Sequence, residues 1–266
     1  MTVAIGGLGA IGLPLARALD AGAVPGLRLV AVAAADPVRA AARVAEFEIP
    51  PEVVPLARLA EADIVVEAAP AAIFLDIAEP AIAAGRILVV ASAGALLPRM
   101  ELVHRAAKTG ARILVPTGAL LGLDAVRAAA EGPVESVTLE TRKPPGGLAG
   151  APYLRRHGID LAGLAEPRLV FAGTALAAAA GFPANVNVAA ALALAGIGPV
   201  RTRVEIWADP GVDRNIHTIR VDAAAARFTM RVENVPSAEN PRTGRLTPLS
   251  VLACLRGLVA VLKVGS

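Results

Sequence analysis

A glycine-rich segment near the start of the chain has the spacing of a dinucleotide-binding loop. Gly7, Gly9 and Gly12 stand between a short apolar strand pattern and an amphipathic helical pattern. In such a loop the first glycine allows a tight turn, the second lets a pyrophosphate approach the backbone, and the third lets the helix pack on the strand. Backbone N–H groups at Ala10, Ile11 and Gly12 then face the phosphates. The sequence therefore predicts a cofactor site here, and the alternative is a glycine-rich turn without a ligand.

The position expected to bind the adenosine ribose is less regular. NAD enzymes commonly carry an acidic residue at the end of the second strand, where it binds the ribose 2′-hydroxyl. Asp36 is the candidate, but it lies one or two positions late, and Ala34 does not repel a 2′-phosphate. Asp36 followed by Pro37 is equally typical of a helix N-cap. The expected cofactor is therefore NAD or NADP.

Small residues follow two later strand patterns, which end at Glu67 and Ala91. Ala69 lies just after the first strand, and Ser92 and Ala93 follow the second directly. In a doubly wound fold these positions lie at the carboxyl edge of the sheet, where ligands bind. We expect Ala69, Ser92 and Ala93 to lie against the nicotinamide ribose, although each segment is equally typical of a plain tight turn.

The three histidines of the chain stand in different contexts. His104 belongs to a helical pattern with a charged face, and His157 follows two arginines in a loop pattern. His217 differs, because strand alternation places it on the same apolar face as Ile219 and Val221. An imidazole on such a face can act as an acid or a base near neutral pH. His217 is therefore the catalytic candidate, and a satisfied core histidine is the alternative.

Two asparagines, Asn185 and Asn187, begin an otherwise apolar helical pattern. Either amide is typical of a helix N-cap. The functional interpretation is that one of them hydrogen-bonds the carboxamide of the cofactor or the substrate. The sequence has no recognisable Ser/His/Asp set, nucleophilic cysteine, paired-carboxylate motif or metal-binding spacing.

The elements that position these residues alternate in the first half of the chain. Strands are expected at 3–5, 27–33, 64–67, 87–91 and 112–115, and helices at 11–21, 37–46, 73–84 and 96–109. Strands alternating with helices predict a parallel sheet covered on both faces, which is a Rossmann doubly wound α/β fold.

The second half of the chain has an α+β pattern instead. Strands are expected at 134–143, 201–208, 216–221 and 227–233, and helices at 122–130, 158–164, 174–180, 187–195 and, last, 249–263. Turn signals join the last three strands without a helix between them. This pattern predicts a smaller α+β domain with a mostly antiparallel sheet.

Composition excludes several classes of protein. Of the 266 residues, 55% are hydrophobic and 18% are charged, which excludes intrinsic disorder. The apolar runs are rich in alanine and are interrupted by polar residues, so none predicts a membrane span. A net charge of +3 with only seven Phe, Trp and Tyr residues argues against nucleic-acid binding. One cysteine and no signal-peptide pattern lead us to expect a soluble, cytoplasmic protein.

Several segments resemble the L-aspartate dehydrogenase family, in the family's order and over nearly the whole chain. They are Val115-Pro116-Thr117-Gly118-Ala119, Gly122-Leu123-Asp124, Thr141-Arg142-Lys143-Pro144-Pro145, Phe182-Pro183-Ala184-Asn185-Val186-Asn187-Val188-Ala189-Ala190-Ala191, Asp213-Arg214-Asn215-Ile216-His217 and Asn240-Pro241-Arg242-Thr243. The Asn-Val-Asn-Val-Ala-Ala and Arg-Asn-x-His segments are specific, whereas the glycine-rich loop is shared with many oxidoreductases.

The resemblance implies a reversible, NAD(P)-dependent oxidative deamination. L-Aspartate would become iminoaspartate, which hydrolyses to oxaloacetate and ammonia. The resemblance also implies that His217 is the active-site histidine and that Ala119 and Asn187 bind the cofactor. The chain departs from the family at Ala34-Ala35, where relatives often carry an acidic and then a basic residue. This departure leaves the choice between NAD and NADP open.

The resemblance further implies a homodimer of two-domain subunits. Residues 1–115 with 241–266 would form the dinucleotide-binding domain, since the family's C-terminal helix returns to it. Residues 116–240 would serve substrate binding, catalysis and dimerisation. Donors for the two substrate carboxylates are expected among Lys143, Arg142, Arg242, Thr117 and Thr243, each of which is also typical of a surface charge or a loop cap.

Two other functions remain compatible with the sequence. A different two-domain reductase, acting on a semialdehyde or a cyclic imine, would keep the Rossmann half and change the substrate pocket. A non-catalytic NAD(P)-binding sensor would keep cofactor affinity without turnover. Ammonium-dependent activity distinguishes the three.

Overall fold

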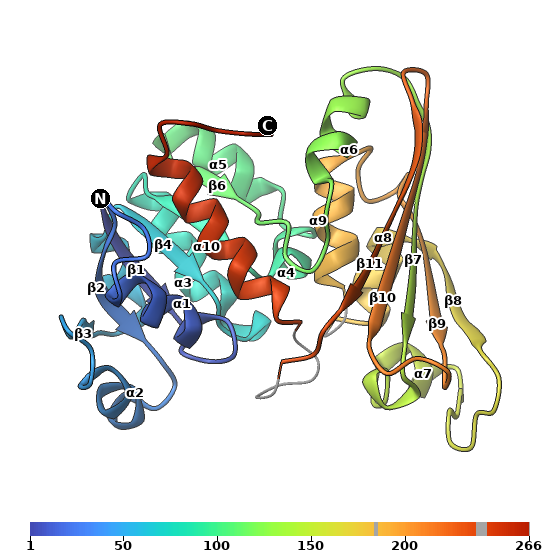
Figure 1. Ribbon diagram of the computed structural model, residues 1–266, viewed down its shortest axis with the longest axis horizontal. Helices are drawn as coiled ribbons and strands as arrows, with labels where there is room; N and C mark the ends of the chain where they lie inside the picture. The colour runs from blue at the N-terminus through green and yellow to red at the C-terminus, as the bar shows by residue number, and fades with distance from the viewer. Residues whose placement is uncertain (184–185, 238–243, 266) are drawn as a thin grey trace. The chain divides into compact units, whose positions relative to one another are not determined.

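The computed structural model describes residues 1–183, 186–237 and 244–265 of the chain. The chain divides into two compact units, one formed by Met1–Gly118 with Thr247–Val264 and the other mainly by Ala119–Leu246. In Figure 1 the first unit begins at the blue N-terminus and includes the red C-terminal helix, while the second runs from green to orange. Among the described residues, each unit is built on one sheet.

The first unit is built on a six-stranded sheet in the order β3-β2-β1-β4-β5-β6. Its strands are β1 (Thr2–Gly6), β2 (Arg28–Ala33), β3 (Glu52–Val53), β4 (Ile64–Glu67), β5 (Ile87–Val90) and β6 (Arg112–Leu114). All neighbouring pairs are parallel, and β1 pairs with both β2 and β4. The predicted Rossmann doubly wound sheet is therefore confirmed. Ligands of such sheets bind where the strand order reverses, outside the carboxyl ends of the strands.

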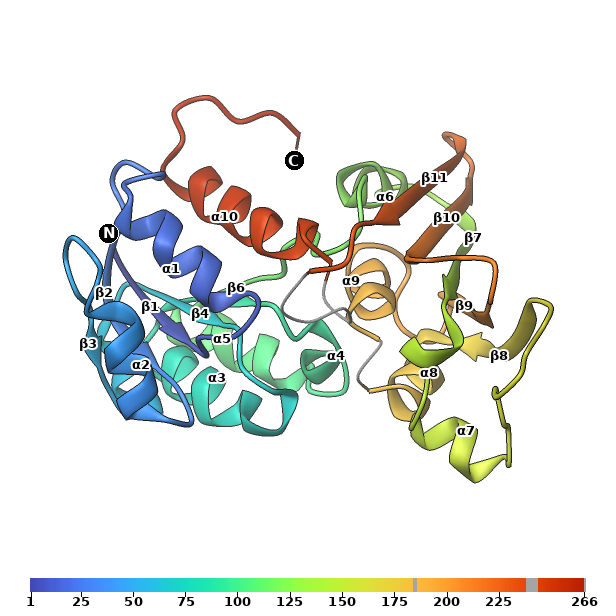
Figure 2. The same cartoon turned by 60° about the horizontal axis from the view of Figure 1, so that its bottom comes forward.

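Helices lie on both sides of this sheet, with α1 and α10 on one side and α3 and α5 on the other (Figure 2). The unit contains α1 (Gly12–Asp20), α2 (Pro37–Val44), α3 (Phe74–Ala83), α4 (Ala93–Leu96), α5 (Glu101–Thr109) and α10 (Leu246–Val259), with 3₁₀ turns η1 (Leu56–Glu61) and η2 (Ala71–Ile73). Leu15 of α1, Val251 of α10 and Val3 of β1 belong to one buried cluster. The C-terminal helix is therefore part of the hydrophobic core of the first unit.

Two helix predictions in this unit need correction. The helix expected at 96–109 is interrupted between α4 and α5, where Pro98 has no N–H to donate to a carbonyl of the preceding turn. The last helix, expected at 249–263, begins and ends earlier as α10. Val261 and Leu262 are exposed, so the end of this apolar run lacks the packing that stabilises a helix.

The second unit contains a five-stranded sheet in the order β11-β10-β7-β9-β8. Its strands are β7 (Val134–Lys143), β8 (Arg168–Thr174), β9 (Arg203–Ala208), β10 (Asn215–Ala223) and β11 (Arg227–Asn234). The pair β7–β9 is parallel and the other pairs are antiparallel, which confirms the mostly antiparallel prediction. Edge strand β8 has no counterpart among the predicted strands, because its buried residues Val170 and Phe171 are adjacent rather than alternating.

The helices of this unit are α6 (Leu123–Ala130), α7 (Pro152–Arg156), α8 (Ala175–Gly181) and α9 (Asn187–Ala195), with the 3₁₀ turn η3 (Pro145–Gly147). α8 and α9 cover one face of the sheet, where Ala178 and Ala189 line a cavity together with Thr141 of β7. The helix expected at 158–164 does not form. Gly158 and Gly163 have φ values of 61° and 67°, which are incompatible with a right-handed helix.

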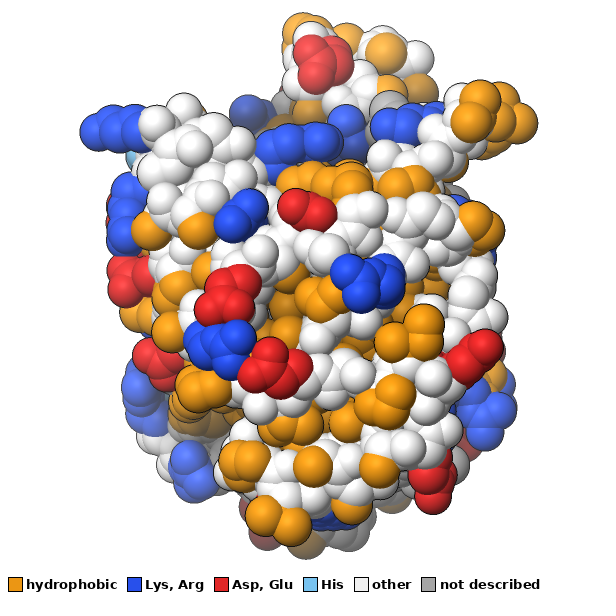
Figure 3. Space-filling model, turned by 90° about the vertical axis from the view of Figure 1, so that its left-hand side faces the viewer, with side chains coloured by type: hydrophobic (Ala, Val, Ile, Leu, Met, Phe, Trp, Pro, Cys, Tyr) orange, Lys and Arg blue, Asp and Glu red, His pale blue; other side chains and the backbone are white. Residues whose placement is uncertain are grey.

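The helices and the charged surface residues of the described part of the chain fit the composition of the sequence. No helix among the described residues is long and apolar enough to cross a membrane. Acidic and basic side chains are interspersed on the face shown in Figure 3. In the first unit, for example, Arg58 pairs with Glu52 at 2.6 Å and with Glu61 at 3.0 Å.

Candidate functional site

The glycines of the loop between β1 and α1 have three different environments. Gly7 has a φ of +99°, and a Cβ there would lie 2.5 Å from the carbonyl oxygen of Ala68. A Cβ on Gly12 would overlap the carbonyl oxygen of Gly7. A Cβ on Gly9 would meet no atom within 4 Å, so the backbone there faces open space. The fold itself requires the first and third glycines, and the second leaves room for a pyrophosphate, so the loop fits a dinucleotide.

Asp36 lies between β2 and α2 and caps the helix. Its carboxylate accepts a 2.9 Å hydrogen bond from the backbone N–H of Arg39. The N-cap interpretation is therefore confirmed, and binding of a ribose hydroxyl by this exposed side chain stays a prediction. Arg43, from the same helix, donates a 2.7 Å hydrogen bond to the carbonyl oxygen of Leu8 and so holds α2 against the glycine-rich loop.

The carboxyl ends of β4 and β5 are joined by a buried carboxylate. Ala69, Ser92 and Ala93 are all buried, and the Glu67 side chain is fully inaccessible to solvent. Glu67 accepts hydrogen bonds from the Ala69 N–H at 3.2 Å, the Ser92 N–H at 3.0 Å and the Ser92 hydroxyl at 3.0 Å. Burial raises the pKa of Glu67, and these hydrogen bonds oppose that shift. The sequence pattern marks Glu67 only as the end of a strand, so this interaction is found by the structure alone.

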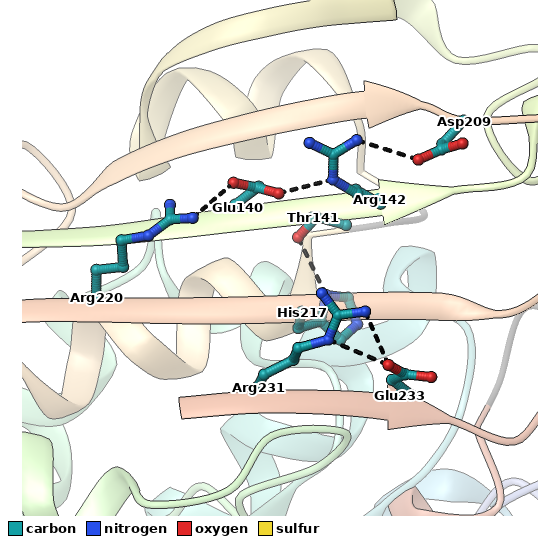
Figure 4. Close-up of polar contacts among 8 residues, drawn as sticks. All are labelled: Glu140, Thr141, Arg142, Asp209, His217, Arg220, Arg231 and Glu233. Atoms are coloured by element: carbon teal, nitrogen blue, oxygen red, sulfur yellow. Dashed lines mark hydrogen bonds and ion pairs between the residues drawn. The ribbon is translucent and has the colours of Figure 1, made fainter. Parts of the chain in front are cut away.

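His217 lies on β10 with its side chain on the helix-covered face of the second sheet. It is 2% exposed, and Ile219 and Val221 are buried with it, as strand alternation predicts. In the β10–β7 register His217 stands opposite Thr141, whose side chain is also buried. Figure 4 shows the 3.1 Å hydrogen bond between the Thr141 Oγ1 and the His217 Nδ1. Because Thr141 occupies Nδ1, the Nε2 atom is the one left for a substrate.

Lys143 shares this face, two residues beyond Thr141 on β7. It is 5% exposed and lines the same cavity as Thr141. Burial lowers the pKa of Lys143 to about 8. Burial also lowers the pKa of His217 to about 3, and the charge of Lys143 adds to that shift. At neutral pH this face therefore holds a neutral imidazole beside a largely protonated amine.

Arg142 points to the opposite face of the sheet. Its guanidinium pairs with Glu140 at 2.7 Å and Asp209 at 3.1 Å, and lies 4.7 Å from the centre of the Trp207 ring. Figure 4 shows Glu140 and Asp209 beside Arg142, with Arg220 on the other side of Glu140. The expectation that Arg142 is a donor to a substrate at His217 is therefore wrong, because consecutive residues of a strand face opposite sides.

Comparison with known proteins assigns the chain to a family. Residues 124–258 match the family described as aspartate dehydrogenase, C-terminal, and residues 7–116 match the homoserine dehydrogenase NAD-binding domain. L-aspartate dehydrogenase 3 of Bordetella bronchiseptica is 55% identical over 99% of this chain and 97% of its own length. The chain belongs to the aspartate dehydrogenase family.

Two further relatives align with the whole length of this chain. An L-aspartate dehydrogenase of Bradyrhizobium diazoefficiens is 54% identical over 100% of this chain and 94% of its own length. The crystal structure of an aspartate dehydrogenase from Thermotoga maritima matches with a TM-score of 0.74 at 25% identity, over 100% of this chain and 99% of that one. The resemblance found in the sequence is therefore confirmed at the level of the family.

The further cofactor- and substrate-binding candidates differ in their surroundings. Ala119 accepts a 2.9 Å hydrogen bond from the Asn234 amide through its carbonyl oxygen. Asn187 is the exposed first residue of α9, and Val186 precedes it at the cap position, so the N-cap interpretation is wrong for Asn187. Thr117 is exposed. The remaining candidates fall outside the described residues: Asn185, Arg242 and Thr243.

The other two histidines lie on the surface, as expected. His104 is exposed on α5, and His157 is exposed at the end of α7, where it stacks on Tyr153 with ring centroids 4.0 Å apart. Within the described part of the chain, no group of three or more His, Cys, Asp or Glu residues is arranged to hold a metal ion. His217 is therefore the histidine whose surroundings suit chemistry.

Proposed function

We propose that the chain is an NAD(P)-dependent L-aspartate dehydrogenase. It oxidises L-aspartate, with NAD(P)⁺ and water, to oxaloacetate, ammonium, NAD(P)H and a proton through iminoaspartate, and it catalyses the reverse amination. The observation that carries this proposal is the buried face of His217, Thr141 and Lys143 in a chain that aligns end to end with L-aspartate dehydrogenases.

The glycine-rich loop supplies the pyrophosphate site in this proposal. Gly9 lets the phosphates approach the backbone, and the N–H groups of Ala10, Ile11 and Gly12 face them at the start of α1. Gly7 provides the turn that brings the loop over the sheet edge. Asp36 stands where the adenosine ribose is expected.

In this proposal Ala69, Ser92 and Ala93 would hold the nicotinamide half, and the resemblance to the family adds Ala119 and Asn187 as cofactor-binding residues. When bound, the nicotinamide accepts the hydride that leaves C2 of aspartate. The protein's part is to hold the two carbons close together and to exclude water from them.

His217 handles the proton of the substrate amine. Hydride can leave C2 only when the nitrogen lone pair is free, so the substrate ammonium must first lose a proton. The imidazole is uncharged at neutral pH, because its pKa is lowered to about 3, and its Nε2 can accept that proton. A dicarboxylate bound beside His217 opposes the charge of Lys143 and raises the pKa of the imidazole toward the range useful for proton transfer.

Lys143 binds a substrate carboxylate. Below its pKa of about 8 the amine carries a charge, and a buried charge is stabilised when an anion pairs with it. Of the two basic candidates on β7, Lys143 lies on the same face of the sheet as His217, and Arg142 lies on the opposite face.

Both NAD and NADP are accepted in this proposal. The carboxylate of Asp36 already caps α2, and Ala34 offers no negative charge against a 2′-phosphate.

The resemblance to the family supports a homodimer in which residues 116–240 form the dimerisation domain. Light scattering of the purified protein should then give twice the mass of the 26.9 kDa chain.

The proposed reaction is tested by following oxidation of NADH and NADPH with oxaloacetate, with and without ammonium. Wild-type protein should turn over only when ammonium is present. His217→Ala should lose at least ~100-fold in turnover, because general acid–base help is worth roughly 10²–10⁴ in rate. His104→Ala, which changes an exposed histidine on α5, is the matched control and should retain wild-type turnover.

The other outcomes point to the competing functions. Oxidation that ignores ammonium would make the protein a carbonyl reductase. Tight NAD(P)H binding without turnover on oxaloacetate or on other imines would indicate a sensor. Equal losses in His217→Ala and His104→Ala would remove His217 from the mechanism.

A further inference from the structure

The buried carboxylate of Glu67 joins two loops at the carboxyl edge of the Rossmann sheet. Glu67 is the last residue of β4 and is fully inaccessible to solvent. Its partners, Ala69 and Ser92, belong to the loops that follow β4 and β5. The two strands are neighbours, so one side chain connects both loops to the same point of the sheet.

The carboxyl group of Glu67 accepts hydrogen bonds at both of its oxygens. The Ala69 N–H points to Oε1 at 3.2 Å, and the Ser92 N–H points to Oε2 at 3.0 Å. The Ser92 hydroxyl donates to Oε1 at 3.0 Å. A backbone N–H cannot turn away from its acceptor, so each oxygen of Glu67 faces a fixed donor, and the Ser92 hydroxyl also lies 3.4 Å from the Ala69 carbonyl oxygen.

The loop after β4 also supports the glycine-rich loop. The Ala68 N–H donates a 2.8 Å hydrogen bond to the carbonyl oxygen of Gly6. The backbone of Ala68 and Ala69 packs so closely on Gly7 that a Cβ there would lie 2.5 Å from the Ala68 oxygen and 2.9 Å from the Ala69 Cα. The loops after β1, β4 and β5 thus form one connected edge, and the Glu67 carboxyl group is buried within it.

We propose that Glu67 is a positioning residue for the nicotinamide half of the cofactor, which it serves by holding the β4 and β5 loops in the form that receives the nicotinamide ribose. Doubly wound sheets bind a dinucleotide across the point where the strand order reverses, here between β2-β1 and β4-β5. The adenosine half then lies on the β2 side, and Glu67 acts on the other half. The proposal rests on the cofactor site and does not depend on the identity of the substrate.

The test separates the two halves of the cofactor. Binding of NADH and of ADP is measured by titration calorimetry on wild type and Glu67→Gln. ADP carries the adenosine and both phosphates but lacks the nicotinamide and its ribose. The glutamine is isosteric, yet its NH₂ group must face one of the two fixed N–H donors, so one loop is displaced. The Kd for NADH should rise roughly tenfold or more, and the Kd for ADP should stay within about twofold of wild type.

Asp63→Asn is the matched control at the other end of the same strand. Asp63 precedes β4 and accepts hydrogen bonds from the Thr2 N–H at 2.7 Å and the Thr2 hydroxyl at 3.0 Å, so it also joins neighbouring strands through a carboxylate. It lies at the amino end of the sheet, away from the loops. Asp63→Asn should therefore leave both Kd values unchanged.

Ser92→Ala is a milder second variant in case Glu67→Gln does not fold. It removes one donor to Glu67 and keeps the carboxyl group, and the NADH Kd should rise by about threefold to tenfold with the ADP Kd unchanged. Equal weakening of NADH and ADP, unaltered NADH binding, or a selective NADH loss in Asp63→Asn would each overturn the proposal. Tight NADH binding by wild type without ammonium-dependent turnover would defeat the proposed reaction and leave the role of Glu67 standing.

Discussion

The two units of the chain build their candidate sites from different materials. At the carboxyl edge of the first sheet the chemistry lies in the backbone, where Gly9 opens space and the start of α1 offers N–H groups. On the helix-covered face of the second sheet it lies in side chains, where His217, Thr141 and Lys143 are buried together. The first site depends on a glycine that has no side chain. The second depends on charged and polar side chains that are buried away from water.

This difference decides how each site should respond to change. A backbone site is damaged by adding atoms, and its affinity is insensitive to pH unless a titratable group supports it. A buried side-chain site is damaged by removing atoms, and its pKa values are shifted because burial penalises charge. Variants of each kind therefore test whether the contrast between the units is real.

The largest effect is expected from adding a methyl group to the glycine-rich loop. Gly9→Ala puts a Cβ into the open space proposed for the pyrophosphate and should raise the NADH Kd at least ~100-fold, with the melting temperature within about 2 °C of wild type. Gly12→Ala, whose Cβ would overlap the Gly7 oxygen, should lose NADH binding and also melt several degrees lower. Normal NADH binding by Gly9→Ala would show that the open space is not the pyrophosphate site.

A somewhat smaller effect is expected from removing the buried amine. Lys143→Met should raise the KM for oxaloacetate at pH 7 by about tenfold to a hundredfold, because a charge-assisted hydrogen bond to the substrate is lost. In wild type the same KM should rise above pH 8, since Lys143 loses its proton and its charge there, and Lys143→Met should lose this dependence. The assay is steady-state kinetics at saturating ammonium.

Arg142→Met is the matched control for the lysine, because it changes the neighbouring residue on the opposite face of β7. Its KM should differ from wild type by less than about twofold. If both variants raise the KM alike, the assignment of the two faces is wrong.

The burial of His217 should appear in the pH dependence of stability. The pKa of His217 is about 3 in the folded state against 6.5 for a model histidine, so between these values the unfolded chain takes up a proton that the folded chain does not. Folding stability from this source is complete above pH 6.5 and is lost as the pH falls. Urea unfolding at pH 7 and pH 5 should show a loss of roughly 2 kcal/mol in wild type that is missing in His217→Gln. An identical loss in the variant would mean that His217 is not buried as a neutral group.

The smallest effect is expected from the partner of the imidazole. Thr141→Val removes the hydroxyl bonded to the His217 Nδ1 and should lower kcat about fivefold to tenfold, with NADH binding unchanged. Thr141→Ser keeps the hydroxyl and should retain most of the activity. If serine and valine lower kcat equally, the methyl group packs the site and the hydroxyl does not orient the imidazole.

Local patterns predicted much of the fold. Strand–helix alternation located the first sheet, and turn signals without helices located the antiparallel strands β10 and β11. The wrong predictions concern elements whose hydrophobic pattern is not periodic, or whose stability depends on contacts distant in the chain. Edge strand β8 has adjacent buried residues, and the apolar run that ends at Val261 and Leu262 finds no core to pack on. The helix expected at 158–164 was prevented by two glycines with positive φ.

Residues whose role depends on their immediate neighbours can be recognised from the amino-acid sequence. The spacing of Gly7, Gly9 and Gly12 is a property of one turn, and the inward direction of His217 follows from alternation within one strand. Contacts between residues far apart in the chain depend on how the strands pair in the folded protein. Thr141 reaches His217 across 76 residues of chain because β7 and β10 pair in a register that no local pattern specifies. Glu67 and Ser92 meet for the same reason, since parallel strands bring their carboxyl ends to one edge only when the sheet has formed.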